Sequence, residues 1–238
     1  MRYELYYWSS IQGRGEFIRL ALEEASAPYV DVARTDGGEE RMLALLADTA
    51  LACPPFAPPF LKSGSRLIGQ TANILLFLGQ HHGLAPKSEA GRLWTHQLQL
   101  TLADLVVEAH DTHHPIAGSL YYEDQRPEAK RRTADFVKNR LPKFVRYFER
   151  VLKSNPSGPA HLVGARLTYA DLSVFQVVAG LRYAFPKVMA RIAKQYPNVM
   201  ALHARVAARP RIAAYLASER RLPFNQQGIF RHYAELDR

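Results

Sequence analysis

Short strand-like and helix-like patterns alternate over the first third of the chain. Tyr3, Leu5 and Tyr7 lie on one face of an alternating segment, which is the period of a β-strand. Elsewhere apolar residues recur every three or four positions, which is the period of a helix. The order βαβαββα predicts a small mixed sheet with helices packed on it. The expected elements are a strand at 2–8, a helix at 16–25, a strand at 29–33, a helix near 39–47, a hairpin over 60–68 and a helix over 71–79.

Beyond residue 91 every recognisable pattern is helical. The clearest apolar face is that of Phe136, Leu141, Phe144 and Phe148, which recur at helical spacing. The stretch 83–91, rich in small residues and containing Pro86, predicts a linker. We therefore expect an α/β domain at 1–83 and an all-α domain at 92–238. Helices are expected near 92–114, 127–153, 169–183, 187–195, 198–207 and 210–219.

Composition indicates a folded protein that stays in the cytoplasm. Apolar residues make up 47% of the 238 positions, which is enough for a packed core and argues against disorder. No apolar run approaches the roughly 18 residues that a membrane helix needs, and the acid at Glu4 does not fit a signal peptide. Cys53 is the single cysteine, so an intrachain disulfide is excluded, as suits a reducing compartment. We expect no membrane association.

The net charge of +9 is concentrated in the helical part. Residues 1–83 carry 7 Lys and Arg against 9 Asp and Glu, whereas the rest of the chain carries 24 against 13. A basic region of this kind is also found in nucleic-acid-binding proteins. Here the basic residues lie opposite an apolar helical face, and no aromatic stacking pattern accompanies them. We therefore expect these basic residues to form a solvated helical surface, and we expect no nucleic-acid partner.

Two short motifs in the first domain suggest a function. In the first, Tyr6-Tyr7-Trp8-Ser9-Ser10-Ile11-Gln12-Gly13-Arg14-Gly15-Glu16, a strand passes through a Gly-rich turn into a helix. The second consists of Ala57-Pro58-Pro59-Phe60-Leu61 and then Gly69-Gln70-Thr71-Ala72-Asn73-Ile74-Leu75. Together they resemble the two halves of the glutathione site in the cytosolic glutathione S-transferase family. Three later segments also resemble parts of this family. Leu167 to Ser173 resembles a capping box of its helical domain, and Pro210 to Leu216 resembles its last regular helix. Pro223 to Arg231 resembles the tails of some bacterial members.

This resemblance implies a fold, a reaction and an assembly. The fold would be an N-terminal thioredoxin-like βαβαββα domain followed by an all-helical C-terminal domain that carries the electrophile site. The reaction would be attack of the glutathione thiolate on a soft hydrophobic electrophile, as in detoxification, with glutathione as co-substrate and no metal. The expected assembly is a homodimer closest to the tyrosine-type classes. The alternative is a catalytically weak transferase-like module that binds apolar ligands or partner proteins.

In the tyrosine-type classes, the residue matching Tyr7 donates a hydrogen bond to the glutathione sulfur. A free thiol titrates near 8.5, and a hydroxyl donor with a nearby helix N-terminus favours its thiolate. Arg14 matches an arginine that helps to hold the thiolate. The loop is one residue longer than the tyrosine-class pattern, so Ser9 or Ser10 remains an alternative donor, as serine is in other classes.

The other site residues follow from the same resemblance. The family has a cis-proline before its third strand, and spacing favours Pro59 over Pro58. Gln70 and Thr71 open a helix whose free N–H groups suit the α-carboxylate of the γ-glutamyl group. Asp104 matches an aspartate that reaches the γ-glutamyl ammonium across a dimer interface.

Histidines cluster near the end of the first long helix. His110 and His114 are four residues apart, with His113 between them, but no further metal ligand is evident nearby. A wall of the electrophile pocket is therefore the more plausible role. Cys53 lies in the Pro-rich loop, away from the first helix start, which disfavours disulfide-exchange chemistry.

Overall fold

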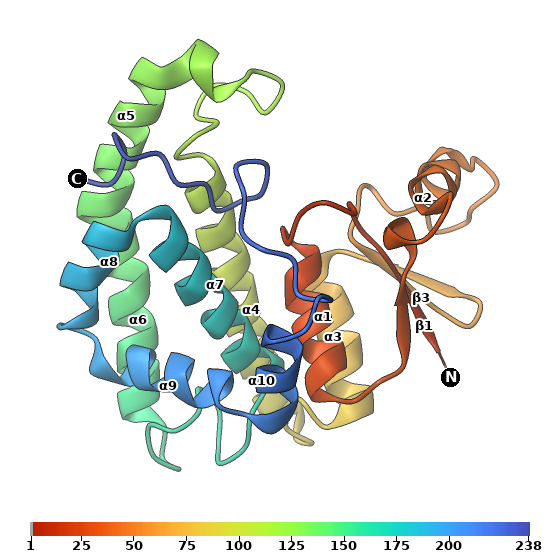
Figure 1. The fold of residues 1–238 in the computed structure, drawn as a ribbon. Helices are drawn as coiled ribbons and strands as arrows, with labels where there is room; N and C mark the ends of the chain where they lie inside the picture. Colours follow the sequence, from red (N-terminus) through yellow and green to blue (C-terminus); the bar gives the residue numbers. More distant parts are fainter. Residues whose placement is uncertain (1) are drawn as a thin grey trace.

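The computed structural model describes residues 2–238, and its N-terminal part is a four-stranded sheet with three helices (Figure 1). The strand order is β2-β1-β3-β4. Strand β2 is parallel to β1, whereas β3 is antiparallel to both β1 and β4. This confirms the thioredoxin-like arrangement expected from the sequence. The elements are β1 (Tyr3–Tyr6), α1 (Gly15–Glu24), β2 (Tyr29–Asp31), α2 (Gly38–Ala47), β3 (Phe60–Ser63), β4 (Arg66–Gly69) and α3 (Thr71–His82).

The two faces of the sheet are covered differently. Leu5 and Leu61, which pair across β1 and β3, lie in the main core with residues of α1 and α3. On the opposite face Tyr6 stacks on Phe60 with ring centroids 4.7 Å apart, in a small cluster with Val32 and Met42. Successive side chains of β1 therefore point to opposite faces of the sheet and pack into the two different cores, as the alternating sequence pattern predicts.

The C-terminal part consists of helices, which confirms the all-α second half. Helix α7 is buried along most of its length and contacts α1, α4, α8 and α9. At its start Thr168 and Asp171 form the predicted capping box. The helices are α4 (Glu89–His110), α5 (Arg126–Asp135), α6 (Leu141–Ser154), α7 (Tyr169–Ala184), α8 (Pro186–Ala193), α9 (Pro197–Ala207) and α10 (Pro210–Leu216), with short turns η1 (Val32–Arg34) and η2 (Tyr122–Gln125). The domain limits at 83 and 92 stay predictions.

Several predicted elements differ in their limits, and two differ in conformation. The second strand ends at Asp31, and Val32–Arg34 forms a 3₁₀ turn. The helix expected over 127–153 has a π-helical turn, η3, at Phe136–Arg140. Pro142 follows in the first turn of α6, and because proline has no N–H, the regular bonding pattern cannot continue there.

The tail after α10 crosses the molecule and returns to the helices (Figure 1). Asn225 Nδ2 donates to the Ser10 carbonyl at 2.8 Å, which joins the tail to the loop after β1. Near its end Asp237 accepts from the backbone N–H groups of Lys187 (2.9 Å) and Val188 (3.0 Å), at the start of α8. The tail is thus held at both the N-terminal loop and the helical part.

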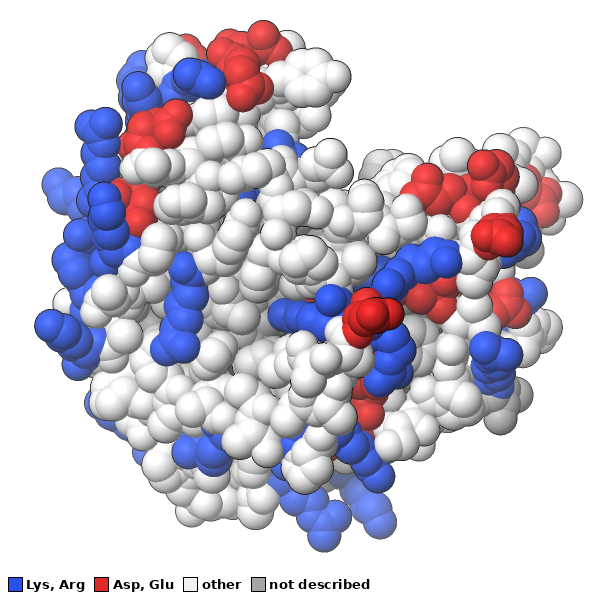
Figure 2. Space-filling model, viewed as in Figure 1, with Lys and Arg blue, Asp and Glu red and all other residues white. Residues whose placement is uncertain are grey.

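The surface reflects the uneven charge of the sequence. Figure 2 shows Lys and Arg side chains along the edge formed by the helical part, and a hollow between the two lobes of the molecule. Exposed basic residues on α6 include Lys143, Arg146 and Arg150. Among residues 2–238, the helices are all too short or too polar to cross a bilayer.

Candidate active site

Tyr7 lies directly after β1, beneath the Gly-rich loop, and only 4% of it is exposed. Its hydroxyl oxygen accepts a hydrogen bond from the Arg14 backbone N–H at 2.9 Å. A Cβ atom at Gly13 would come within 2.0 Å of this oxygen, and one at Gly15 within 2.6 Å of the ring. Glycine is therefore required for the loop to close over the tyrosine.

The pKa of Tyr7 is raised, chiefly because burial disfavours the phenolate. The Arg14 N–H and the positive charges of Arg14 and Arg19 oppose this rise. Since the pKa moves upward from 10, the hydroxyl keeps its proton at neutral pH. With one lone pair taken by Arg14, Tyr7 can still donate its O–H to a second group.

Arg14, Gln70 and Thr71 meet at one cavity of about 470 Å³. We call it the Thr71 cavity. It lies where the starts of α1 and α3 face α4, and its volume is in the range of roughly 300–1,000 Å³ that is typical of small-ligand sites. Gln70 precedes α3 with a positive φ of 68°, and its carbonyl accepts the first helical bond from Ile74 at 2.9 Å. The first N–H groups of α3 therefore remain available for an anion.

Three polar atoms in residues lining the Thr71 cavity have no hydrogen-bond partner within the described part of the chain. They are Thr71 Oγ1, His96 Nδ1 and Gln99 Oε1, and all three atoms are shielded from solvent. Buried polar atoms without partners are costly, so they favour a polar ligand at this place. Burial lowers the pKa of His96, which favours its neutral form.

The sequence reasoning missed His96 and Gln99. Both lie on α4, three residues apart and on one helical face, so spacing offered a signal. That signal was weak, because polar residues at this spacing are also typical of the solvent-exposed face of a helix. The remaining residues lining the cavity are Phe17, Ala72, Asn73, Leu100, Ala103, Val106 and Val107.

The two serines after Tyr7 point to other partners. Ser9 donates its hydroxyl to Glu39 of α2, and its backbone N–H bonds the same carboxylate at 3.2 Å. Ser10 is exposed, and its carbonyl is bonded by Asn225. Neither residue lines the Thr71 cavity.

Tyr7, the prolines and Asp104 also lie outside the cavity lining. The peptide bond between Pro58 and Pro59 is cis and directly precedes β3. Asp104 is on the exposed face of α4, beside the lining residue Ala103. A role for Asp104 would thus require a group from outside this chain.

The histidine cluster packs against the tail. Ring centroids of His110, His113 and His114 are 4.8–5.2 Å apart. His113 is 1% exposed, and its Nε2 bonds the Ile229 carbonyl at 2.8 Å. Burial lowers the pKa of His113 to about 3. Its contacts are therefore those of a residue that fastens the tail.

Comparisons with known proteins give similar chains of one kind. Residues 110–219 match the family described as glutathione S-transferase, C-terminal domain. A glutathione S-transferase of Plasmodium falciparum is 23% identical over 220 residues, covering 91% of this chain and 95% of that protein. Glutathione S-transferase Mu 6 of Mus musculus is 27% identical over 222 residues, covering 92% of each.

A solved structure shows the same fold. The Pi-class glutathione S-transferase of Onchocerca volvulus superposes with a TM-score of 0.70 at 21% identity, covering 91% of this chain and 92% of the other. The sequence relatives span nearly the whole chain, and the family match falls in the helical part. This chain is thus similar to glutathione S-transferases in sequence over nearly its whole length, and it shares their fold.

Proposed function

We propose that this protein is a glutathione transferase that joins the glutathione thiolate to a soft hydrophobic electrophile. The observation that carries the proposal is the Thr71 cavity, which brings Arg14, the start of α3 and unpartnered buried polar atoms together. A peptide-like ligand with a carboxylate would satisfy these groups. Glutathione, the co-substrate of the relatives' named activity, is such a ligand.

In this proposal Tyr7 stabilises the thiolate. Its hydroxyl, oriented by the Arg14 N–H, donates a hydrogen bond to the sulfur, while the N-terminus of α3 and the Arg14 side chain hold carboxylate charge. Reaction then needs only proximity to the electrophile, with no covalent enzyme intermediate. These roles make the protein a tyrosine-type transferase.

The electrophile is proposed to bind in the hollow between the two lobes (Figure 2). The loop after α4 lies on the side of the helical lobe that faces α2 (Figure 1). This loop exposes apolar side chains, namely Ile116 (60%), Leu120 (37%) and Tyr121 (78%). Exposed apolar groups that border a hollow suit a hydrophobic substrate.

We propose a cytoplasmic location, which suits a chain whose single cysteine, Cys53, is exposed and free. The relatives compared above are eukaryotic, so the likeness of the tail to bacterial members stays a prediction.

A homodimer is proposed to complete the site. Leu93, Leu100 and Val107 recur every seven residues on α4 and are 65%, 48% and 46% exposed. Leu100 and Val107 also line the Thr71 cavity, so a second copy covering this stripe would close the cavity. The partner copy would then bring its Asp104 to the γ-glutamyl ammonium. Exposed Phe56 (94%) offers a further apolar contact.

The dimer is tested with Leu93→Glu and Asp104→Ala. Light scattering should show a dimer for the wild type and a monomer for Leu93→Glu. Asp104→Ala should stay dimeric and folded but bind glutathione roughly 1.5–3 kcal/mol more weakly, because one charge-assisted contact is lost. A wild-type monomer with full glutathione affinity would refute the dimeric site.

The function is tested by calorimetric binding of glutathione together with conjugation of an aryl halide. Thr71→Val should weaken binding by about 1 kcal/mol or more, because the valine keeps the shape and removes the hydroxyl. Thr101→Val is the matched control on α4, since its hydroxyl bonds the Gln97 carbonyl at 3.0 Å away from the cavity lining. Absence of glutathione binding would overturn the proposal, whereas binding without turnover would favour a transferase-like binding module.

A further inference from the structure

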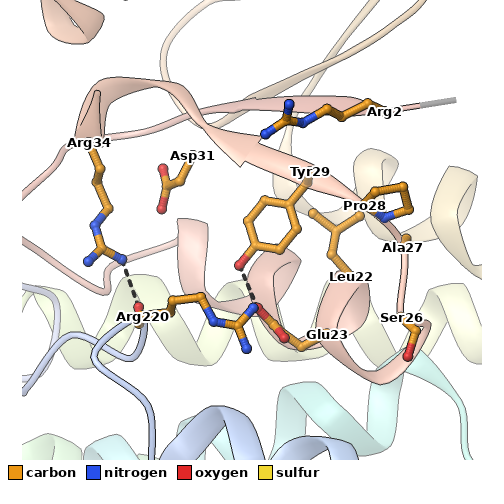
Figure 3. Close-up of a pocket in the computed structure, with 10 residues that line it drawn as sticks. All are labelled: Arg2, Leu22, Glu23, Ser26, Ala27, Pro28, Tyr29, Asp31, Arg34 and Arg220. Atoms are coloured by element: carbon orange, nitrogen blue, oxygen red, sulfur yellow. Dashed lines mark hydrogen bonds and ion pairs between the residues drawn. The ribbon is translucent and has the colours of Figure 1, made fainter. Parts of the chain in front are cut away.

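A second cavity lies beside the edge strand β2. Its volume is about 740 Å³, and it shares no lining residue with the Thr71 cavity. We call it the Tyr29 cavity. Figure 3 shows side chains converging on it from β2, from the end of α1, from η1 and from the segment after α10. The residues that line it are Arg2, Leu22, Glu23, Ser26, Ala27, Pro28, Tyr29, Asp31, Arg34 and Arg220.

Both acidic residues of the Tyr29 cavity already have cationic partners. Glu23 accepts from Arg220 at 2.6 Å and from the Tyr29 hydroxyl at 2.9 Å (Figure 3). Asp31 accepts from the buried Arg19 at 2.7 Å. Each carboxylate therefore has a cationic partner, and Asp31 Oδ1 is left without a hydrogen-bond partner among residues 2–238.

Two arginines of the cavity have no carboxylate partner among residues 2–238. Arg34 donates to the backbone carbonyls of Arg220 at 2.7 Å and Glu219 at 3.3 Å, which orient its guanidinium without cancelling its charge. Arg2 has no ion pair within the described chain. The cavity thus has two uncompensated positive charges, each on a side chain that can hold an oxyanion through paired N–H groups.

The remaining wall is apolar. Leu22 and Ala27 are buried in the floor, and Pro28 and the ring of Tyr29 stand beside them (Figure 3). The Tyr29 ring is positioned by its bond to Glu23, so it presents a fixed face to the cavity. Such a wall favours a flat apolar group adjoining the anionic one.

We propose that the Tyr29 cavity binds an organic phosphate monoester with an aromatic body. A phosphate monoester has a charge of about −1.5 to −2 at pH 7, which matches the two uncompensated guanidinium groups. Its aromatic part lies against Tyr29 and Pro28. The site is separate from the proposed conjugation site, and the ligand is bound without chemical change.

The test is calorimetric binding of 1-naphthyl phosphate, with 1-naphthol and inorganic phosphate as comparison probes. Glutathione and an S-alkyl glutathione are kept in excess, so that the proposed conjugation site is filled. 1-Naphthyl phosphate should bind at least tenfold more tightly than either comparison probe, and its affinity should fall as NaCl rises. Equal binding of 1-naphthol would contradict the role of the arginines, and equal binding of inorganic phosphate would contradict the role of the apolar wall.

Variants assign the binding to this cavity. Arg2→Gln should weaken 1-naphthyl phosphate binding about tenfold, because one charge-assisted contact is lost, while Arg2→Lys should weaken it less, because lysine keeps the charge and loses only the paired N–H groups. Arg146→Gln, an exposed arginine on α6, is the matched control and should bind as the wild type does. Unchanged affinity in both Arg2→Gln and Arg34→Gln would overturn the proposal, whether or not the protein binds glutathione.

Discussion

Helix α1 contributes to two buried polar regions that differ in how fully their atoms are paired. Its preceding loop and first turn give Arg14 and Phe17 to the Thr71 cavity, where three shielded polar atoms lack partners. The same turn gives Glu16 to a second region, which we call the Glu16 junction and which consists of Gln12, Glu16, Arg19, Gln176, Tyr215 and Arg221.

In the Glu16 junction most of the polar atoms have partners, and Arg19 Nη2 is the exception among its described atoms. Glu16 is fully buried and accepts from Arg19 (3.3 Å), from the Tyr215 hydroxyl (2.8 Å) and from Arg221. Gln176 connects the junction to the loop, accepting from Arg221 at 3.0 Å and donating to Gln12 at 2.8 Å. The pKa of Tyr215 is raised by burial and by the Glu16 charge, so it remains a donor.

Because the two regions differ in how many of their polar atoms are paired, we expect the Glu16 junction to contribute to stability and the Thr71 cavity to contribute to ligand binding. A buried network of paired groups fixes the two halves of the chain against each other, because losing a member leaves others unpaired. The unpaired atoms of the Thr71 cavity cost stability in the free protein, and a ligand can recover that cost. Mutations in the junction should therefore affect folding, and mutations in the cavity should affect binding.

The largest effect is expected for Glu16→Gln. The substitution keeps the size but leaves Arg221 without its carboxylate and the buried Arg19 with Asp31 alone, which should lower the free energy of unfolding by about 3–5 kcal/mol. Thermal denaturation would then show a melting temperature lower by about 10 °C. Glu40→Gln, an exposed residue of α2, is the control and should change stability by less than about 0.5 kcal/mol. If Glu16→Gln melts at the wild-type temperature, the Glu16 junction does not stabilise the fold in the way described.

Tyr7→Phe should affect the reaction rather than folding. It removes the hydroxyl and keeps the ring under Gly13 and Gly15, so the pKa of the bound glutathione thiol should rise by roughly one to two units. Glutathione affinity should change little, and the rate lost near neutral pH should partly return at higher pH. An absorbance titration of the bound thiolate measures the pKa directly. An unchanged thiol pKa would remove Tyr7 from the proposed mechanism.

His113 provides a third case, a buried histidine that belongs to neither region. Its Nδ1 atom has no hydrogen-bond partner among residues 2–238. Its pKa falls from 6.5 to about 3 on burial, so the folded state binds fewer protons than the unfolded state between these values. Its contribution to stability is therefore present above pH 6.5 and is lost as pH falls toward 3, by on the order of 1 kcal/mol per pH unit.

The measurement is denaturant unfolding of the wild type and His113→Phe between pH 7 and pH 4. The stability difference between the two proteins should shift in favour of the variant as pH falls, since the variant has no imidazole to protonate. A difference that stays constant with pH would contradict this account of the buried histidine.

The smallest effect is expected for Ser10→Ala. Ser10 is exposed, and its structural contact is made by its backbone carbonyl, which alanine retains. The pKa of the bound thiol should change by less than about 0.4 units, corresponding to about 0.5 kcal/mol. A larger rise in Ser10→Ala than in Tyr7→Phe would move the protein to the serine type.

The sequence alone determined the order of elements and the local parts of the candidate site. The alternation through Tyr7, the Gly13-Arg14-Gly15 turn and the helix start at Thr71 are short-range signals, because strand period, turn chemistry and capping depend on neighbouring residues. Such signals also placed the capping box of Thr168 and Asp171. They did not foresee the π-helical turn before Pro142, which interrupts an otherwise regular apolar pattern.

Only the tertiary structure decided which distant residues meet. His96 and Gln99 face Thr71 because α4 packs against α3, and Tyr215 reaches Glu16 because α10 packs against α1. The Tyr29 cavity likewise joins Arg2, Arg34 and Arg220 from both ends of the chain. Each of these side chains reads as an ordinary surface residue in its own segment. Its role follows from burial and partners, which packing of the whole chain creates and which no local pattern encodes.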